Sequence, residues 1–267
     1  MKNRPPLIWV RGAGEIGSAT AISLHRTGFP VLLSEIHPPL AIRRTVTFSD
    51  AIMEGETWAA GVTAKYRLVK DITGEPTPDF IPIVRDNPCE ILTLRPTLII
   101  DARMIKTYNE DFRGWADHVI GFGPGFIAGQ NCHVVIETMR GHDLGKIIFD
   151  GAPLPNTGIP GTLGGESSRR VLYAPAAGTL HWDVDFGTIL QEGDHMGNIN
   201  GTIEIRSPLA GIVRGLIHPS VPMKKGLKIA DVDPRGEGIG FMNLSDKARS
   251  LGRAALEAVL IFMSNNP

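Results

Sequence analysis

The sequence predicts an α/β protein in which a Rossmann-like parallel sheet domain precedes a smaller β domain and a C-terminal helix. Three observations predict this order. A glycine-rich turn at 12–17 joins an apolar strand to a helix, an internal repeat begins near residue 171, and an amphipathic stretch follows residue 244. We expect the first domain over 1–150, a Gly/Pro-rich connection over 151–170, the β domain over 171–235, and the helix over 236–267, packed on the core.

Composition limits the classes of protein that fit. The chain has 267 residues, 42% of them hydrophobic, and a net charge of -1, which supports a packed core and excludes a strongly basic nucleic-acid binder. Two cysteines are too few for a disulfide framework or a four-cysteine zinc site, so no metal site is expected. No apolar run approaches the roughly 20 residues that cross a bilayer, and the start of the chain lacks the pattern of a signal peptide. We expect a cytoplasmic protein that binds neither nucleic acid nor membrane.

The first forty residues carry the pattern of a dinucleotide-binding unit. The apolar run Leu7–Val10 is followed by the expected cofactor-binding turn, which consists of Gly12, Ala13, Gly14, Glu15, Ile16 and Gly17. In this pattern Gly12 permits the tight turn, Gly14 lets the backbone approach a pyrophosphate, and Gly17 lets helix and strand pack closely. A helix expected over Ser18–Thr27 would offer its N-terminal N–H groups to the phosphate.

An acidic residue stands where a ribose would need one. A second strand, expected at Val31–Leu33, closes at Glu35, which follows Gly17 at close to the spacing that the dinucleotide-binding pattern requires. A carboxylate there can accept hydrogen bonds from the two ribose hydroxyls, and it would repel a 2′-phosphate, so Glu35 favours NAD over NADP. The alternative is a domain of the same fold that has lost its ligand or binds a different one.

The middle of the chain predicts further strands whose ends carry polar or glycine-rich segments. The expected elements are a helix over Val46–Glu56 and strands at Ala64–Val69, Ile81–Val84, Thr97–Ile100, Asp117–Ile120 and His133–Ile136. Asp101 and Arg103 follow one strand and are placed to face a ligand, because ligands of open α/β sheets lie beyond the carboxyl ends of strands. A mutual ion pair is the alternative. Gly123 and Gly125 follow the next strand, where they form either an anion-binding nest or a simple bend.

The last of these strands leads to further candidates for catalysis. Arg140 and His142 lie just after Glu137, and His142 titrates near neutral pH and could move protons. With Asp101 they are the candidate catalytic residues, although a single loop histidine also fits a structural role. Cys132 beside His133 does not form a nucleophile pair, because adjacent strand residues point to opposite faces.

The second half contains an internal repeat. The same interval separates Pro175 from Pro208, Gly178 from Gly211, and Gly193 from Gly226, and apolar positions match between the two copies. The pattern resembles the two halves of biotinyl/lipoyl-like β barrel-sandwich domains. In those domains the carrier lysine sits on the hairpin between the halves, where this chain has Asn200. Because no lysine occurs between Val171 and Met223, a carrier function is excluded.

Two carboxylates and a helix follow the repeat. Asp231 and Asp233 share one face of a strand and could bind a hard cation, but an ion pair with Arg235 is the alternative interpretation. Ser245 is a plausible N-cap of the last helix. The apolar stripe of that helix is expected in the core and consists of Ala248, Leu251, Ala255, Val259 and Phe262.

Taken together, these segments resemble the YqeB-type proteins of the selenium-dependent molybdenum hydroxylase system. The segments that carry the resemblance are 11–18, 101–104, 121–126, 137–142, 156–158 and 228–235. Ala230 departs from the glycine that the pattern has, which affects backbone geometry more than chemistry. The first domain is also similar to the Rossmann domain of xanthine dehydrogenase accessory factors.

The resemblance implies a maturation factor for a selenium-dependent molybdenum hydroxylase. Such a protein would bind a small phosphate-bearing ligand, either a nucleotide or a molybdopterin-type cofactor. It would also bind the apoenzyme of the hydroxylase. A homo-oligomer is compatible with this role. Two alternatives stay open. One is an NAD-dependent oxidoreductase with His142 as proton donor, and the other is a non-enzymatic adaptor that docks to a molybdenum hydroxylase through the β domain.

Overall fold

The computed structural model describes residues 6–107, 110–158 and 161–265, and it divides the chain into two compact units. The first unit contains 1–37, 46–156 and 244–267, and the second contains 38–45 and 157–243. Compared with the predicted ranges, the first unit gains the C-terminal helix, and a short segment, 38–45, belongs to the second.

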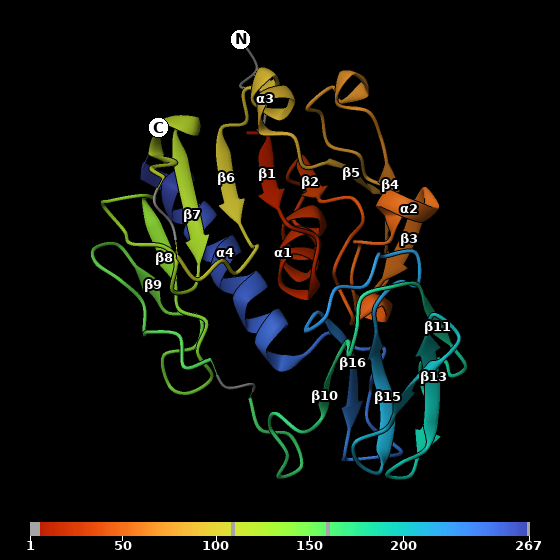
Figure 1. Cartoon of the computed structure of the whole chain (residues 1–267). Coiled ribbons are helices and arrows are strands. Elements are labelled where there is room, and N and C mark those ends of the chain that lie inside the picture. The colour runs from red at the N-terminus through yellow and green to blue at the C-terminus, as the bar shows by residue number, and fades with distance from the viewer. Residues whose placement is uncertain (1–5, 108–109, 159–160, 266–267) are drawn as a thin grey trace. The chain divides into compact units, whose positions relative to one another are not determined.

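The first unit is built on a nine-stranded sheet with the order β3-β4-β5-β2-β1-β6-β7-β8-β9 (Figure 1). Its strands are β1 Ile8–Arg11, β2 Val31–Glu35, β3 Glu56–Ala59, β4 Val62–Tyr66, β5 Ile81–Arg85, β6 Leu98–Asp101, β7 His118–Phe122, β8 Val134–Ile136 and β9 Ile147–Ile148. Its helices are α1 Glu15–Arg26, α2 Ala51–Glu54, α3 Pro88–Ile91 and α4 Asp246–Asn265, with 3-10 turns η1 Arg44–Val46 (whose last residue alone is in this unit), η2 Val69–Asp71, η3 Leu92–Leu94 and η4 Arg113–Trp115.

Two different layers cover the two faces of this sheet. On one face α1 and α4 pack against buried side chains that include Ile8, Val10 and Ile100. On the other face Trp9, Leu32 and Ile99 are covered by short elements and loops. Since Trp9 alternates with Ile8 and Val10 along β1, the strand is buried on both faces, as its continuous apolar run requires.

The second unit consists of two antiparallel sheets. One has the order β10-β16-β15-β12 and the other β11-β13-β14. The strands are β10 Val171–Tyr173, β11 Leu180–Trp182, β12 Ile189–Leu190, β13 His195–Ile199, β14 Ile203–Arg206, β15 Gly211–Leu216 and β16 Lys228–Asp233. A separate apolar core fills this unit, and Ile42 from the short early segment belongs to it.

The predicted Rossmann-like parallel sheet is wrong, because the observed sheet is mixed. β3 pairs antiparallel with β4, and β9 pairs antiparallel with β8. Ala60 and Gly61 both have positive φ, 48° and 82°, so they form the two-residue hairpin that turns β3 back along β4. The expected helix over 46–56 is reduced to η1 and the four-residue α2, and β3 begins where it should have ended.

The predicted biotinyl/lipoyl-like barrel-sandwich of two equal halves is also wrong. Strands β10, β11, β12 and β13 come from the first repeat, whereas only β14, β15 and β16 come from the second. Pro222 lies where the counterpart of Ile189 in β12 would be needed, and proline has no N–H to give to a strand ladder. The expected turn at Asn200 and Gly201 does connect β13 to β14, with φ of 56° and 73°.

The last helix follows the prediction closely. Ser245 Oγ accepts a hydrogen bond from the Ala248 N–H at 3.1 Å, as an N-cap does. Leu251, Ala255 and Val259 are fully buried, and Phe262 is partly buried. None of the helices among the described residues combines the length and apolar character that spanning a bilayer requires.

Candidate functional site

The glycine turn after β1 has the geometry that its sequence predicts. Gly12 has a φ of 95° and donates its N–H to the Ser34 carbonyl oxygen at 2.8 Å. A Cβ on Gly17 would lie 1.8 Å from the Gly12 carbonyl oxygen, so helix α1 approaches β1 as closely as the backbones allow. A Cβ on Gly14, in contrast, would meet no atom within 4 Å. The space beside Gly14 is therefore open.

Helix α1 begins directly after Gly14, and no side chain caps its N-terminus. The first N–H groups of a helix have no partner within the helix, and they carry a partial positive charge. Glu15 belongs to the first turn and accepts a hydrogen bond from the Ser245 N–H at 2.7 Å through Oε1. The turn therefore presents backbone at Gly14, while the Glu15 carboxylate is engaged with the start of the last helix.

Glu35 holds the turn in place. Its Oε2 accepts the Ala13 N–H and its Oε1 accepts the Ile36 N–H, each at 2.8 Å. Burial raises the pKa of Glu35, while these two backbone hydrogen bonds act in the opposite direction. The carboxylate was expected to receive ribose hydroxyls; in the structure both of its oxygens already accept backbone donors. Its observed contacts link the glycine turn to the segment after β2.

A buried ionic network lies under the turn. The Arg11 guanidinium donates to both carboxylate oxygens of Asp86 at 3.1 Å, and its Nη1 is 4.0 Å from Asp101 Oδ2. Asp86 also accepts the Ser34 hydroxyl at 2.9 Å. Arg11 and Asp101 are only 8% and 3% exposed, so these ion pairs compensate charges that are buried in the interior. Sequence reasoning missed Arg11 and Asp86, although both stand at the end of an apolar strand run, as Asp101 does.

Asp101 and Arg103 form an ion pair at the end of β6. Arg103 donates to Asp101 from its backbone N–H, its Nε and its Nη2, at distances of 3.1, 3.0 and 2.6 Å. A Cβ on Gly12 would lie 3.1 Å from Arg103 Cγ. The structure therefore brings Gly12, Glu35, Asp101 and Arg103 to the same edge of the sheet, at the carboxyl ends of β1, β2 and β6.

The second glycine segment is a bend. Gly123 has a φ of 86°, donates its N–H to the Ile136 carbonyl oxygen at 3.2 Å and accepts the Phe126 N–H at the same distance. A Cβ on Gly121 would lie 2.1 Å from Phe126 Cγ, so this glycine makes room for the Phe126 ring. The carbonyl oxygen of Gly125 accepts a hydrogen bond from Asn131. These contacts favour the bend interpretation over an anion-binding nest.

The candidate catalytic residues after β8 lie at the surface. Arg140 forms an ion pair with Asp246, and His142 is exposed. Glu137 is buried and accepts N–H groups from Thr138, Met139 and Leu154 at 2.6, 2.7 and 2.6 Å. Asp101 is bound by Arg103 at the end of another strand. Nothing in these contacts joins Asp101, Arg140 and His142 into one constellation.

A pocket of about 690 Å³ opens at the carboxyl ends of β2, β4 and β5. Its lining is both polar and apolar and includes Ile36, His37, Tyr66, Arg67, Leu68, Val69, Val84, Arg85, Asp86, Asn87 and Glu90. Glu35 links this pocket to the glycine turn, because its carboxylate accepts the N–H of Ile36, which lines the pocket, and the N–H of Ala13 in the turn. Its volume falls within the range that is usual for small-molecule sites. Among the described residues, no group of three or more His, Cys, Asp or Glu side chains is placed to hold a metal ion.

No family model matches the sequence. A protein of Escherichia coli (strain K12) described as uncharacterized protein YqeB is 42% identical over 259 residues, which cover 96% of this chain and 48% of that protein. The chain is a homologue of YqeB. It spans about half the length of this relative. The expected resemblance to YqeB is thus confirmed. The description of that relative names no role in a selenium-dependent molybdenum hydroxylase system.

Solved structures give weaker similarities. They include the product-bound ectoine utilization protein EutE (DoeB) from Ruegeria pomeroyi, with 13% identity, coverage of 86% of this chain and 85% of that chain, and a TM-score of 0.31. A succinylglutamate desuccinylase from Silicibacter sp. TM1040 has 13% identity, the same coverages and a TM-score of 0.27. A succinylglutamate desuccinylase/aspartoacylase from Rhodobacter sphaeroides has 10% identity, coverages of 88% and 87%, and a TM-score of 0.32. At these values the similarity transfers no activity.

The predicted functions are contradicted by these comparisons. The solved structures are described as desuccinylases, aspartoacylases and ectoine utilization proteins. They are not described as accessory factors of a molybdenum hydroxylase or as NAD-dependent oxidoreductases. The maturation role, the NAD-dependent oxidoreductase and the hydroxylase adaptor are therefore corrected, together with the expectations of a Rossmann fold, NAD, selenium and molybdenum cofactor.

Proposed function

We propose that this chain binds a small phosphate-bearing organic ligand at the carboxyl edge of the nine-stranded sheet. The phosphate lies beside Gly14 at the N-terminus of α1, and the organic part enters the pocket lined by Ile36, Tyr66 and Asp86. The observation that carries this proposal is the 690 Å³ pocket, which Glu35 links by hydrogen bonds to the turn where the space beside Gly14 is open.

The position of the glycine turn, directly after β1, agrees with the topology of the sheet. Parallel pairing runs from β4 through β5, β2, β1, β6 and β7 to β8. From β1 the chain continues first to β2 on one side and later to β6 on the other, so the strand order reverses at β1. Ligands of open α/β sheets bind outside the carboxyl ends of strands near such a reversal.

The contacts of the turn define what each residue does on binding. Glu35 keeps the Ala13 amide in place, so the turn does not have to be ordered when the ligand arrives. Arg11 and Asp86 form an ion pair beneath the turn and stabilise the base of the site. The N-terminal amides of α1 supply the attraction for the phosphate without a metal ion.

Calorimetric titration with inorganic pyrophosphate and a panel of organic phosphates tests the proposal. A Gly14→Val variant adds a side chain in the space assigned to the phosphate, where no atom lies within 4 Å. We expect this variant to fold and to lose at least tenfold in affinity. Gly114→Val is the matched control, since Gly114 also has open space at its Cβ position and no positive φ. Unchanged binding in Gly14→Val, or no binding of any phosphate by the parent protein, would refute the proposed site.

A further inference from the structure

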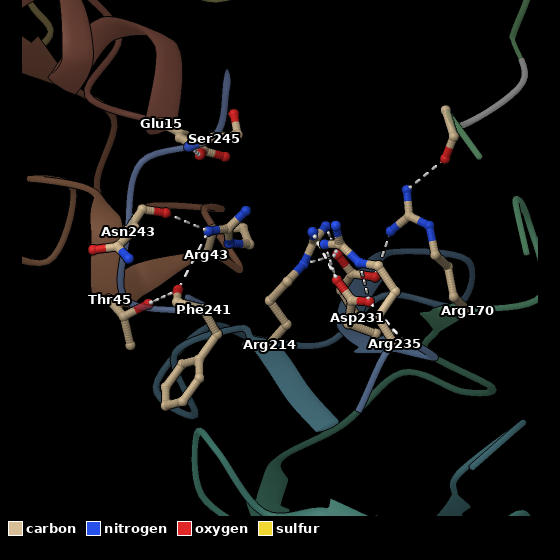
Figure 2. A network of polar contacts seen from close by, with 12 residues as sticks. Glu15, Arg43, Thr45, Arg170, Arg214, Asp231, Arg235, Phe241, Asn243 and Ser245 are labelled. Atoms are coloured by element: carbon tan, nitrogen blue, oxygen red, sulfur yellow. Dashed lines mark hydrogen bonds and ion pairs between the residues drawn. The ribbon is translucent and has the colours of Figure 1, made fainter. Parts of the chain in front are cut away.

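Three arginines of the second unit are paired with two carboxylates of β16. Figure 2 shows Asp231 bound from two sides: Arg170 Nη1 donates to its Oδ1 and Arg214 Nη2 donates to its Oδ2, each at 2.5 Å. Asp233 accepts Arg214 Nη1 at 3.2 Å and Arg235 Nη2 at 2.7 Å. The alternative of an ion pair with Arg235 is thus what the structure has, and the arginines stand where a hard cation would have to bind.

Arg85 in the first unit differs from these arginines, because its charge has no partner. It is the last residue of β5, it is exposed to solvent, and it lines the 690 Å³ pocket. Within the described part of the chain, its guanidinium group makes no hydrogen bond or ion pair. The adjacent Asp86 is engaged elsewhere, since both of its carboxylate oxygens bind Arg11 and one of them also accepts the Ser34 hydroxyl.

The other carboxylates near Arg85 also have other partners. The register of the sheet pairs Glu35 with Arg85, which places both side chains on the same face. The two Glu35 oxygens accept backbone N–H groups of the glycine turn and of the segment after β2. Glu90 accepts a hydrogen bond from Asn87 Nδ2 at 2.8 Å. An acceptor for Arg85 therefore has to come from water or from a ligand.

The other arginine of the pocket lining already has partners. Arg67 Nη1 donates to the Tyr66 carbonyl oxygen at 2.8 Å, and its guanidinium carbon lies 4.8 Å from the centre of the Phe80 ring. A cation above an aromatic face is stabilised there. Arg85 is thus the arginine of the pocket whose donors are left for a ligand.

Two exposed aliphatic side chains line the same pocket. Ile36 is 44% exposed and Leu68 is 47% exposed. Ile36 follows β2 and Leu68 follows β4, and these two strands flank β5 in the sheet. Apolar side chains that are exposed in a pocket beside a charged group suit a ligand with an apolar body and a charged end.

We infer that the ligand of this site carries a carboxylate, bound by Arg85, at the end opposite to its phosphate; this inference rests on the proposed function. A guanidinium group presents two parallel N–H donors that match the two oxygens of a carboxylate. One unpaired arginine matches the single charge of a carboxylate better than the nearly double charge of a second phosphate. Because β2 separates β1 from β5, the backbone at the end of β1 lies about 10 Å from that of Arg85. The ligand is therefore an elongated phosphorylated carboxylic acid with an apolar middle.

Calorimetric titration of the full chain with a matched pair of probes tests this inference. The first probe is hexyl phosphate. The second is the phosphate ester of ω-hydroxyhexanoic acid, in which a carboxylate replaces the terminal methyl group of the first. We expect the second probe to bind more tightly by about tenfold. Arg85→Gln should bring the two affinities to within about twofold of each other, whereas Arg85→Lys, which keeps the charge but not the forked donors, should keep part of the preference.

Arg253→Gln is the matched control, since Arg253 is an exposed arginine of α4 outside the pocket lining, and it should leave the preference as it is in the parent protein. Gly14→Val should weaken both probes alike and so keep their ratio, which separates this inference from the proposed phosphate site. Equal binding of the two probes, tighter binding of hexanediol bisphosphate than of the carboxylate probe, or an undiminished preference in Arg85→Gln would overturn the inference alone. Binding of neither probe by the parent protein would overturn the proposed function with it.

Discussion

At the scale of single residues, the surroundings of His133 and His118 determine how the stability of the protein depends on pH. His133 Nδ1 accepts the Val119 N–H at 2.9 Å, so this nitrogen must be unprotonated in the folded protein. Desolvation lowers the pKa of His133, and the charges of His118 and Arg113 act in the same direction. His118 is stacked on Phe262, with ring centroids 3.9 Å apart, and desolvation lowers its pKa also.

These two histidines predict a loss of stability on the acid side. A histidine whose pKa is lower in the folded than in the unfolded state binds protons preferentially after unfolding. Its contribution is present above the unfolded pKa of about 6.5 and is lost as the pH falls toward the folded value. Urea unfolding at pH 7 and pH 5 should therefore show a lower free energy of unfolding at pH 5.

His133→Asn separates the protonation of His133 from the loss of its hydrogen bond. Asparagine can still accept the Val119 N–H, and it does not titrate. We expect this variant to lose less stability between pH 7 and pH 5 than the parent protein. An identical pH profile for the parent and His133→Asn would contradict this assignment.

At the scale of elements, the packing of α1 against α4 depends on a glycine inside the last helix. A Cβ on Gly252 would lie 2.7 Å from the Ala19 carbonyl oxygen and 2.9 Å from the Ala19 carbonyl carbon. These are backbone atoms of α1 and cannot move aside as a flexible side chain can. The glycine therefore sets how closely the two helices approach.

Gly252→Ala should destabilise the protein by about 1–3 kcal/mol, as overpacking does. Alanine has the higher helix propensity by about 1 kcal/mol, so this result requires the clash to outweigh propensity. Thermal unfolding of Gly252→Ala, with Gly114→Ala at an open position as control, measures the difference. A melting temperature above that of the parent protein would show that the helices separate at little cost.

The elements also show what sequence could and could not predict. Strands β1, β2, β5 and β6 were predicted because each is a short apolar run buried on both faces, and α4 because its stripe and its Ser245 cap are local. The β3–β4 hairpin was missed because Ala60 and Gly61 do not have the usual Asn-Gly composition of such turns. The two copies of the repeat differ at Pro222, which has no N–H for a strand ladder, so that Met223 forms a single bridge with Gly178 where the first copy has β12.

The candidate site was predictable only in part. Gly12, Gly14 and Gly17 were found because a backbone turn leaves a local signature. Arg11, Asp86 and the pocket residues at 66–69 come from segments far apart in sequence, and only the strand order places them together. The fold also decides that Glu35 fastens the turn rather than standing free.

At the scale of the whole molecule, each unit contains chain from both halves of the sequence. Ile42 lies in the early segment 38–45 but is buried in the core of the second unit, where its carbonyl oxygen accepts the Leu216 N–H at 2.8 Å. Its Cδ1 would lie 3.2 Å from a Cβ on Gly215. Loss of this side chain should therefore be felt in the second unit.

Ile42→Ala should cost about 2–5 kcal/mol, as removal of a buried isoleucine does. Hydrogen exchange should become faster in β15 of the second unit and stay unchanged in β6 of the first. Leu40→Ala, in the same segment but 46% exposed, is the matched control and should leave both strands as they are. Faster exchange in β6 to the same extent would mean that the two units unfold together.

The interrupted course of the first unit has a consequence for biosynthesis. During translation, α4 emerges from the ribosome only after the entire second unit. Leu24 and Ile22 of α1 therefore lack their partner helix while most of the remaining chain is translated. Until then a nascent chain displays an apolar helix surface, which is the kind of surface that chaperones bind.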